Sequence, residues 1–101
     1  SQPRVQQWEG ENEEVLRIEG SIFFGACDYL QKLMQHSRGE RLVLDAHHVN
    51  FIDFAGAQML QQEARRLASE GRSLVLRNAR PRVRAELEKQ MGKGGVLLVE
   101  E

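Results

Sequence analysis

Several features are scarce in this 101-residue chain, and each scarcity excludes a class of protein. Cys27 is the single cysteine, so no intrachain disulfide forms, and this cysteine content is compatible with a protein of a reducing compartment. No apolar run approaches the roughly 20 residues that a membrane-spanning helix needs, and no signal peptide is visible. Because the chain begins with Ser1 and not methionine, we expect it to be a piece excised from a longer protein.

The charge balance is close to neutral overall but uneven along the chain. The net charge of −1 argues against general nucleic-acid binding. Residues 64–93, however, carry nine basic and three acidic groups. This basic half is typical either of a face that meets an anionic partner or of ordinary solvated helix surfaces.

Short apolar runs alternate with helical patterns, which predicts an α/β fold. Strands are expected at residues 5–9, 14–19, 42–45, 73–77 and 96–99, and helices at 26–34, 58–70 and 81–91. The first two strands are close enough to pair as a hairpin, and the crossovers that link the later ones imply parallel pairing. We predict one domain over residues 1–101, with its core at about 5–99, as a mixed sheet of about five strands with three main α-helices packed on it (β-β-α-β-α-β-α-β).

Turns and helix faces follow from the same patterns. Loops are expected at residues 20–25 and 50–56, a left-handed helix cap at Gly39, a helix stop at Gly71, and a break at 92–95. The second helix should bury Leu60, Ala64 and Leu67. Its solvent side is expected to carry Gln58, Gln61, Gln62, Arg65, Arg66 and Ser69.

No metal site is predicted from the three histidines. His47 and His48 are adjacent, and neighbouring residues of an extended chain point in opposite directions, so they should not share one metal ion. His36 lies in a different element. We interpret all three as ordinary surface or strand-end histidines.

A catalytic set is not evident either, and we expect the protein not to be an enzyme. Cys27 lies in the first turn of a helix, which can lower a thiol pKa, but no base accompanies it. Asp45 and Asp53 flank one strand–loop unit and are compatible with acid–base work. An aspartate at a helix entrance, like Asp53, more often accepts backbone N–H bonds.

Four phenylalanines lie in two loops that each precede a helix: Phe23, Phe24, Phe51 and Phe54. In a two-layer α/β fold these loops meet at one edge of the sheet. The side chains are expected either to fill the core beneath the loops or to leave an apolar docking patch exposed beside the second helix.

These segments together resemble the STAS domain, shared by anti-sigma-factor antagonists and by the cytoplasmic tails of SulP-type anion transporters. The resemblance rests on Arg17–Ala26, on Leu42–Asp45 leading into Val49–Gly56, on Leu60–Leu67 followed by Gly71, and on Leu74–Leu76 with the next helix. It covers about residues 5–99. The Phe-Phe-Gly-Ala segment at Phe23 is similar to the transporter branch.

The chain departs from the antagonist branch of this family at the motif before the second helix. Anti-sigma antagonists usually carry Asp-Ser-Ser-Gly or a similar sequence before the second helix, and a kinase phosphorylates the second hydroxyl residue. Here Asp53, Phe54, Ala55 and Gly56 occupy these positions, so the chain has no phospho-acceptor there. The departure is compatible with the transporter branch.

The resemblance implies a non-catalytic regulatory domain on the cytoplasmic side of the inner membrane, bound to the transport domain of the same polypeptide. The expected contact residues are Asp53, Phe54, Ala55, Gly56, Phe23 and Phe24, with Arg65 and Arg66 facing an acidic cytosolic protein. The alternative is a free-standing antagonist-like protein without the phospho-acceptor serine. No cofactor is expected. Weak nucleotide binding stays open, with phosphates near the start of the second helix.

Overall fold

The computed structural model describes residues 2–91 and 95–100. Its elements are β1 (Arg4–Glu9), β2 (Glu13–Ile22), the short 3₁₀ turn η1 (Phe24–Ala26), α1 (Cys27–Gln35), β3 (Arg41–Ile52), α2 (Phe54–Ser69), β4 (Ser73–Arg77), α3 (Pro81–Met91) and β5 (Leu98–Glu100). The five strands form one sheet in the order β1-β2-β3-β4-β5. The β1–β2 pair is antiparallel, and all other pairs are parallel. The predicted mixed α/β sheet is confirmed.

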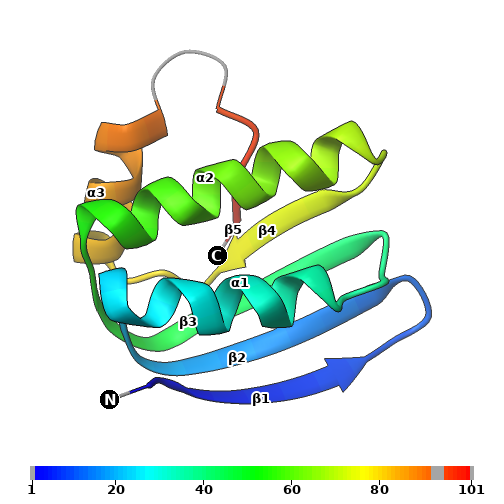
Figure 1. Ribbon diagram of the computed structural model, residues 1–101, viewed down its shortest axis with the longest axis horizontal. Coiled ribbons are helices and arrows are strands. Elements are labelled where there is room, and N and C mark those ends of the chain that lie inside the picture. Colours follow the sequence, from blue (N-terminus) through cyan, green and yellow to red (C-terminus); the bar gives the residue numbers. More distant parts are fainter. Residues whose placement is uncertain (1, 92–94, 101) are drawn as a thin grey trace.

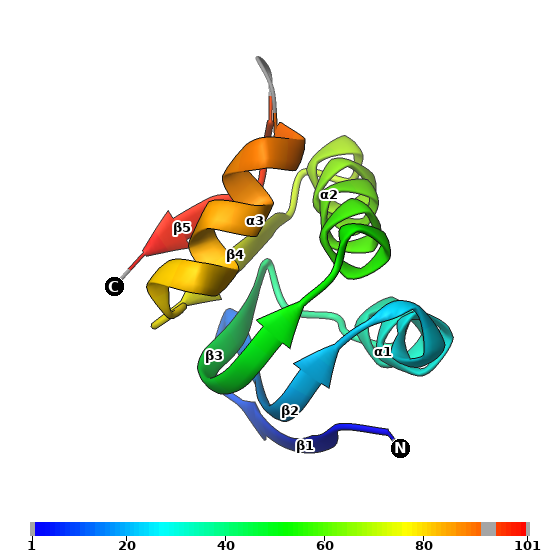
Figure 2. The same ribbon diagram turned by 90° about the vertical axis from the view of Figure 1, so that its left-hand side faces the viewer.

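The helices lie together on one face of this sheet (Figures 1 and 2). Each crossover advances by one strand in the same direction, and right-handed crossovers then place every helix on the same side. A single core cluster accordingly joins the inward side chains of the strands to those of the helices. Its fully buried large members include Leu16, Ile18, Leu30, Met34, Leu42, Leu44, Leu60, Leu67, Leu74 and Leu76. Each such side chain contributes roughly 1.5–3 kcal/mol on burial.

The opposite face of the sheet carries one continuous apolar row. Trp8, Val15, Val43, Val75 and Leu98 pair in register across all five strands. Trp8 and Leu98 at the two ends are exposed, but Val43 and Val75 in the middle are 0% and 1% exposed. Since none of the described helices lies on this face, side chains of the neighbouring rows must cover these two valines (Figure 2).

Four charged side chains around the two valines close into a cycle, which we call the ion-pair ring (Glu13, Arg41, Arg77 and Glu100). Arg41 meets Glu13 and Glu100 at 3.3 Å each, and Arg77 meets Glu100 at 2.7 Å and Glu13 at 3.6 Å. The arginine stems supply apolar cover while their charged ends stay partly in water. At the β1 edge, Arg17 stacks over the Trp8 ring at 5.0 Å.

Two predicted loops are wrong in extent, because the strands continue into them. Strand β2 reaches Ile22 and β3 reaches Ile52, and the pairing of these two residues closes the ladder. Gly20 makes this continuation feasible, since its φ of +119° is unfavourable for other residues. Helix α2 then begins at Phe54, one turn earlier than the hydrophobic pattern predicts.

The two predicted glycine caps have different outcomes. Gly71 ends α2 with φ +75°, and the N–H groups of Gly71 and Arg72 bond back to the carbonyls of Ala68 and Leu67, which is a Schellman motif. The left-handed cap at Gly39 is wrong, since its φ is not positive. Gly39 instead lies so close to β2 that a Cβ would come within 3.0 Å of the Glu14 backbone nitrogen.

The helix faces are mostly as predicted. Val83 and Leu87 are buried and Met91 is half-buried. The expectation for Gln61 is wrong: this side chain is only 2% exposed, and its amide has no hydrogen-bond partner among the described residues. The last strand is Leu98–Glu100 where 96–99 was predicted, and most of the predicted break at 92–95 lies outside the described residues.

Candidate functional site

Arg65 and Arg66 lie well along α2, but the other residues predicted to be functional gather at one edge of the sheet. Strands β2, β3 and β4 end there, and α1, α2 and α3 begin there (Figure 1). Loops at the carboxyl ends of parallel strands are the usual location of binding sites in α/β folds. The residues that line this edge therefore decide what the domain can bind.

Asp53 ties two of these loops together. Its Oδ1 accepts the N–H of Gly56 at 2.8 Å, which caps α2, and its Oδ2 accepts the N–H of Phe24 at 3.0 Å. Its own N–H donates to the Ile22 carbonyl. The expectation that Asp53 accepts backbone N–H bonds is confirmed, and each of its two carboxylate oxygens accepts one such bond.

Gly56 allows the start of α2 to touch the end of β2. A Cβ at this position would collide with the Ile22 carbonyl oxygen and would lie 2.9 Å from Ile22 Cγ2. Only a glycine fits this approach without a backbone shift. Asp53 and Gly56 thus fix the relative positions of the two loops.

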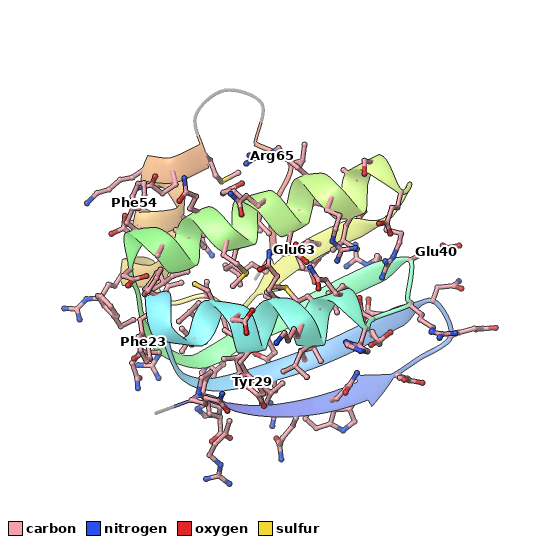
Figure 3. The ribbon with its side chains drawn as sticks, in the orientation of Figure 1. Phe23, Tyr29, Glu40, Phe54, Glu63 and Arg65 are labelled. Atoms are coloured by element: carbon pink, nitrogen blue, oxygen red, sulfur yellow. The ribbon has the colours of Figure 1, made fainter. Side chains whose placement is uncertain are left out.

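The aromatic residues divide between core and surface. Phe23 is half-buried and packs against the core, whereas Phe24 is 78% exposed and Phe54 is 56% exposed. Phe51 is exposed as well. Phe23 and Phe54 both lie at the edge where α1 and α2 begin (Figure 3). Three of the four phenylalanines therefore present apolar surface to solvent, and we call Phe24, Phe51 and Phe54 the aromatic set.

Ala55 lies in the first turn of α2 and is half-exposed. It follows Phe54 and precedes the buried Gly56, and its methyl group offers no hydroxyl. The α2 start can therefore not be switched by phosphorylation at this residue.

The two adjacent arginines of α2 are not equivalent. Arg65 is exposed, but Arg66 is only partly exposed and pairs with Glu63 at 2.9 Å and Glu70 at 3.2 Å. The expectation that both arginines form one exposed face is wrong. The cause is Glu63, which is buried between the helices and holds the Arg66 guanidinium.

The histidine pair also differs from the prediction. The ladder between β2 and β3 shifts register between Arg17 and Glu19, which gives β3 an extra residue next to His47. This bulge leaves His47 and His48 both exposed, with ring centroids 4.8 Å apart. Within residues 2–91 and 95–100, no group of three His, Cys, Asp or Glu side chains is placed to hold a metal ion.

The other candidate groups for chemistry are used structurally. Burial, followed by the nearby Asp53 carboxylate, raises the pKa of the Cys27 thiol, so Cys27 is a poor nucleophile. Burial favours a higher pKa for Asp45, but hydrogen bonds from the His47 N–H, Arg17 and Asn78 outweigh it and lower the pKa. Asp45 and Asp53 thus serve different partners and do not form an acid–base pair.

Comparison of the sequence with known protein families identifies the domain. The family model of the STAS domain matches residues 4–91. The chain belongs to the STAS domain family. No curated protein matches it in sequence.

Solved structures share the fold of this STAS domain. The unphosphorylated anti-sigma factor antagonist SpoIIAA aligns with a TM-score of 0.74 and 17% identity over 95% of this chain and 87% of that one. The murine anion transporter Slc26a9 aligns with a TM-score of 0.74 and 17% identity, over 87% of this chain but 15% of the transporter. A serine-to-glutamate variant of RsbS from Moorella thermoacetica aligns with a TM-score of 0.69 and 19% identity, over 95% of this chain and 85% of that one. At these identities the likeness concerns the fold.

Sequence reasoning missed two buried carboxylates of this STAS domain, Glu14 and Glu63. Glu14 accepts the N–H groups of Arg38 and Gly39 at 2.6 and 3.1 Å and so holds the loop before β3. A signal existed, because Glu14 alternates with Leu16 and Ile18 on the inward face of β2. For Glu63 the helix period gives a signal too, because Glu63 lies three residues after Leu60 and four before Leu67, on the same face of α2.

Over the part of the STAS domain that the structure describes, no helix is both long and apolar enough to cross a membrane.

Proposed function

We propose that this STAS domain is a non-catalytic regulatory module that binds another protein domain. Its contact surface is the edge formed by Asp53–Gly56 together with Phe23 and Phe24. The observation that carries the proposal is the exposure of Phe24 and Phe54 on loops that Asp53 holds in place. Exposed aromatic side chains on a rigid support are typical anchors of protein interfaces.

The surface is fixed and not switched at its centre. The Asp53 side chain accepts one backbone N–H from each loop, and Ala55 lies where the antagonist branch carries a phosphorylated hydroxyl. A phosphate there would add nearly two negative charges at a helix start. Binding to this domain is therefore regulated by the partner or by distant groups.

The proposed partner is the membrane transport domain of the same polypeptide, in a bacterial SulP-type transporter of sulfate or another inorganic anion. The domain would then lie on the cytoplasmic side of the inner membrane. Two observations support this assignment: the fold likeness to Slc26a9, and the Phe-Phe-Gly-Ala segment at Phe23. Exposed Arg65 is the group that would meet an acidic cytosolic protein.

The second candidate is a free-standing anti-sigma-factor antagonist-like protein, which the fold likeness to SpoIIAA supports equally. It would use the same edge to bind an anti-sigma kinase. The coding sequence upstream of Ser1 distinguishes the two. A multi-span membrane segment supports the transporter, and a start codon near Ser1 supports the antagonist.

Nucleotide binding at the start of α2 is a separate proposal. The Asp53 carboxylate already caps this helix end, and its negative charge opposes a phosphate there. Titration with labelled ATP and GTP tests it, and a signal that does not saturate would remove it.

The docking surface is tested by placing a charge on it. Ala55→Glu adds a carboxylate in the first turn of α2, where the helix dipole tolerates it, so the domain should stay folded. We expect severalfold lower transport by the parent protein. Ala85→Glu, the same change at an exposed position of α3, is the matched control. Equal transport by both variants would place the contact elsewhere.

A further inference from the structure

A second surface at the same edge is separate from the aromatic set. Two adjoining hollows lie beyond the end of β4, beside residues 45–48 of β3, and they share His47 and Asn78. The first has a volume of about 360 Å³ and reaches Pro81 and Arg84 at the start of α3. The second has a volume of about 400 Å³ and adds Arg17, Asp45 and His48. We call the two together the His47 cleft.

The bulge in β3 is what builds this cleft. In a regular strand His47 and His48 would face opposite sides of the sheet. The extra residue instead brings both rings to the surface beside each other, with an edge-to-face angle of 73°. Bulges commonly re-aim side chains beside functional sites.

Basic groups dominate the cleft. Arg17 and Arg84 line it, and Arg80 reaches it through a hydrogen bond of 3.0 Å from its Nε to the His47 carbonyl. That bond leaves the two terminal nitrogens of the exposed Arg80 guanidinium available as donors. Both imidazoles add further ring nitrogens that can donate.

Arg80 supplies the excess positive charge of the cleft, because the charge of Arg17 is offset by the carboxylate of the lining, Asp45. Its Oδ2 accepts from Arg17 Nε at 3.3 Å, and its Oδ1 accepts the N–H of His47 at 3.1 Å. Asn78 also donates to it. The acceptor oxygens of Asp45 are thus used within the protein, so the groups that the cleft offers to a ligand are mainly hydrogen-bond donors.

The backbone keeps the cleft open. Asn78 has φ +62°, a left-handed conformation that asparagine tolerates, and its N–H bonds to the Glu100 carbonyl of β5. The chain thus turns sharply between β4 and α3, and the positive end of the α3 dipole points toward the same space. The dipole adds to the side-chain charges and does not replace them.

We propose that the His47 cleft binds a tetrahedral oxyanion, either free phosphate or sulfate or the phosphate end of a small organic ester. Arginine forks and imidazole N–H groups match oxyanion oxygens in geometry and charge. The volume of each hollow exceeds what one phosphate needs, which leaves room for an attached organic group. The site is independent of the proposed docking function, because it uses none of its contact residues.

The test is an amide NMR titration of the 101-residue chain with inorganic phosphate, sodium sulfate and glycerol phosphate in turn, at constant ionic strength. Sodium chloride serves as the reference anion. We expect saturable shifts at His47, His48, Asn78 and Arg80 with all three oxyanions and none with chloride. Tighter binding of glycerol phosphate would identify an organic ester as the ligand class, and equal binding would identify the free anion.

Matched variants assign the binding to the cleft. Arg80→Gln should weaken it by about tenfold, since one charge-assisted contact is lost. Arg38→Gln removes the same charge from an exposed position at the opposite end of the sheet and should leave the affinity unchanged. The double variant His47→Gln/His48→Gln removes both imidazoles from the cleft and tests the same assignment by its effect on affinity, without changing an arginine. Shifts that fail to saturate, or that respond equally to Arg80→Gln and Arg38→Gln, would overturn the proposal.

Discussion

Arg77 Nε donates to Glu100 Oε1 at 2.7 Å, and this contact attaches the last strand to the ion-pair ring. Strand β5 has only three residues, so its backbone ladder to β4 is short. The ring adds contacts from Glu100 to both β3 and β4. The end of the sheet is thus held by side chains as much as by backbone bonds.

Breaking the ring should loosen β5 selectively. Glu100→Gln removes the charge that Arg41 and Arg77 share, so we expect faster amide hydrogen exchange in β5 and a lower urea midpoint. Salt should lower the midpoint of the unchanged protein more than that of the variant, because only the former has the full ring to screen. Glu88→Gln, an exposed change on α3, is the control. If the β5 amides exchanged at the same rate in Glu100→Gln and in the unchanged protein, the backbone ladder alone would hold β5.

Glu14 should make the stability depend on pH. Burial favours a higher pKa, but the hydrogen bonds from Arg38, Gly39 and Gln7 and the charge of Arg72 outweigh it and lower the pKa below 4.5. A lowered folded pKa means that the contribution to stability is full above about pH 4.5 and is lost as the pH falls through the folded value.

Glu14→Gln should therefore flatten the acid limb of the stability curve, measured by urea unfolding between neutral pH and about pH 3. At neutral pH the variant should lose about 1–3 kcal/mol, since a charge-assisted buried acceptor is replaced by a weaker one. Asp45→Asn is the comparison, because the pKa of Asp45 is also lowered. An unchanged acid limb in Glu14→Gln would assign the effect to other carboxylates.

Asp53 should couple the two loops of the docking edge. Asp53→Ala removes the cap of α2 and the acceptor for Phe24, so we expect a loss of about 1 kcal/mol or more in the free energy of unfolding. Amide exchange should accelerate at Phe24 as well as at Gly56. Asp53→Asn keeps an acceptor oxygen and should restore the cap but not both contacts. Acceleration confined to Gly56 would mean that Phe24 is held by other groups.

Gln61 should be replaceable with a gain in stability. Its buried amide makes no hydrogen bond among the described residues, which costs about 1–3 kcal/mol per unpaired group. Gln61→Met keeps the length and flexibility of the side chain, and thermal unfolding should shift upward. Gln62→Met, at the exposed neighbouring position, is the control. A loss of stability in Gln61→Met would indicate that the amide has a partner.

The sequence alone was sufficient for the order and type of the elements. Alternation in β2 and the three- and four-residue spacing in α2 depend on burial of one face, which is a local signal. It also identified Asp53 as a helix cap and Gly71 as a helix stop, because both depend on a few adjacent residues.

The errors come from contacts between distant segments. Residues 47–52 continue β3 because β2 pairs with them, and their own sequence, His-His-Val-Asn-Phe-Ile, shows no regular alternation that would predict it. The bulge at His47 is likewise a property of two strands together. Gln61 lies at the margin of the apolar face of α2, and its burial depends on the packing of α2 against its neighbours.

The strand order has a consequence for how the domain folds. Every strand pairs with the strand that precedes it in the chain, so no pairing waits for a segment made much later. Growth can start at the β1–β2 hairpin and add one crossover at a time, and each addition closes a loop of similar, moderate length. During synthesis the growing edge of the sheet is always the newest strand, until short β5 ends the series, whereas the outer edge of β1 takes no further strand in the described sheet.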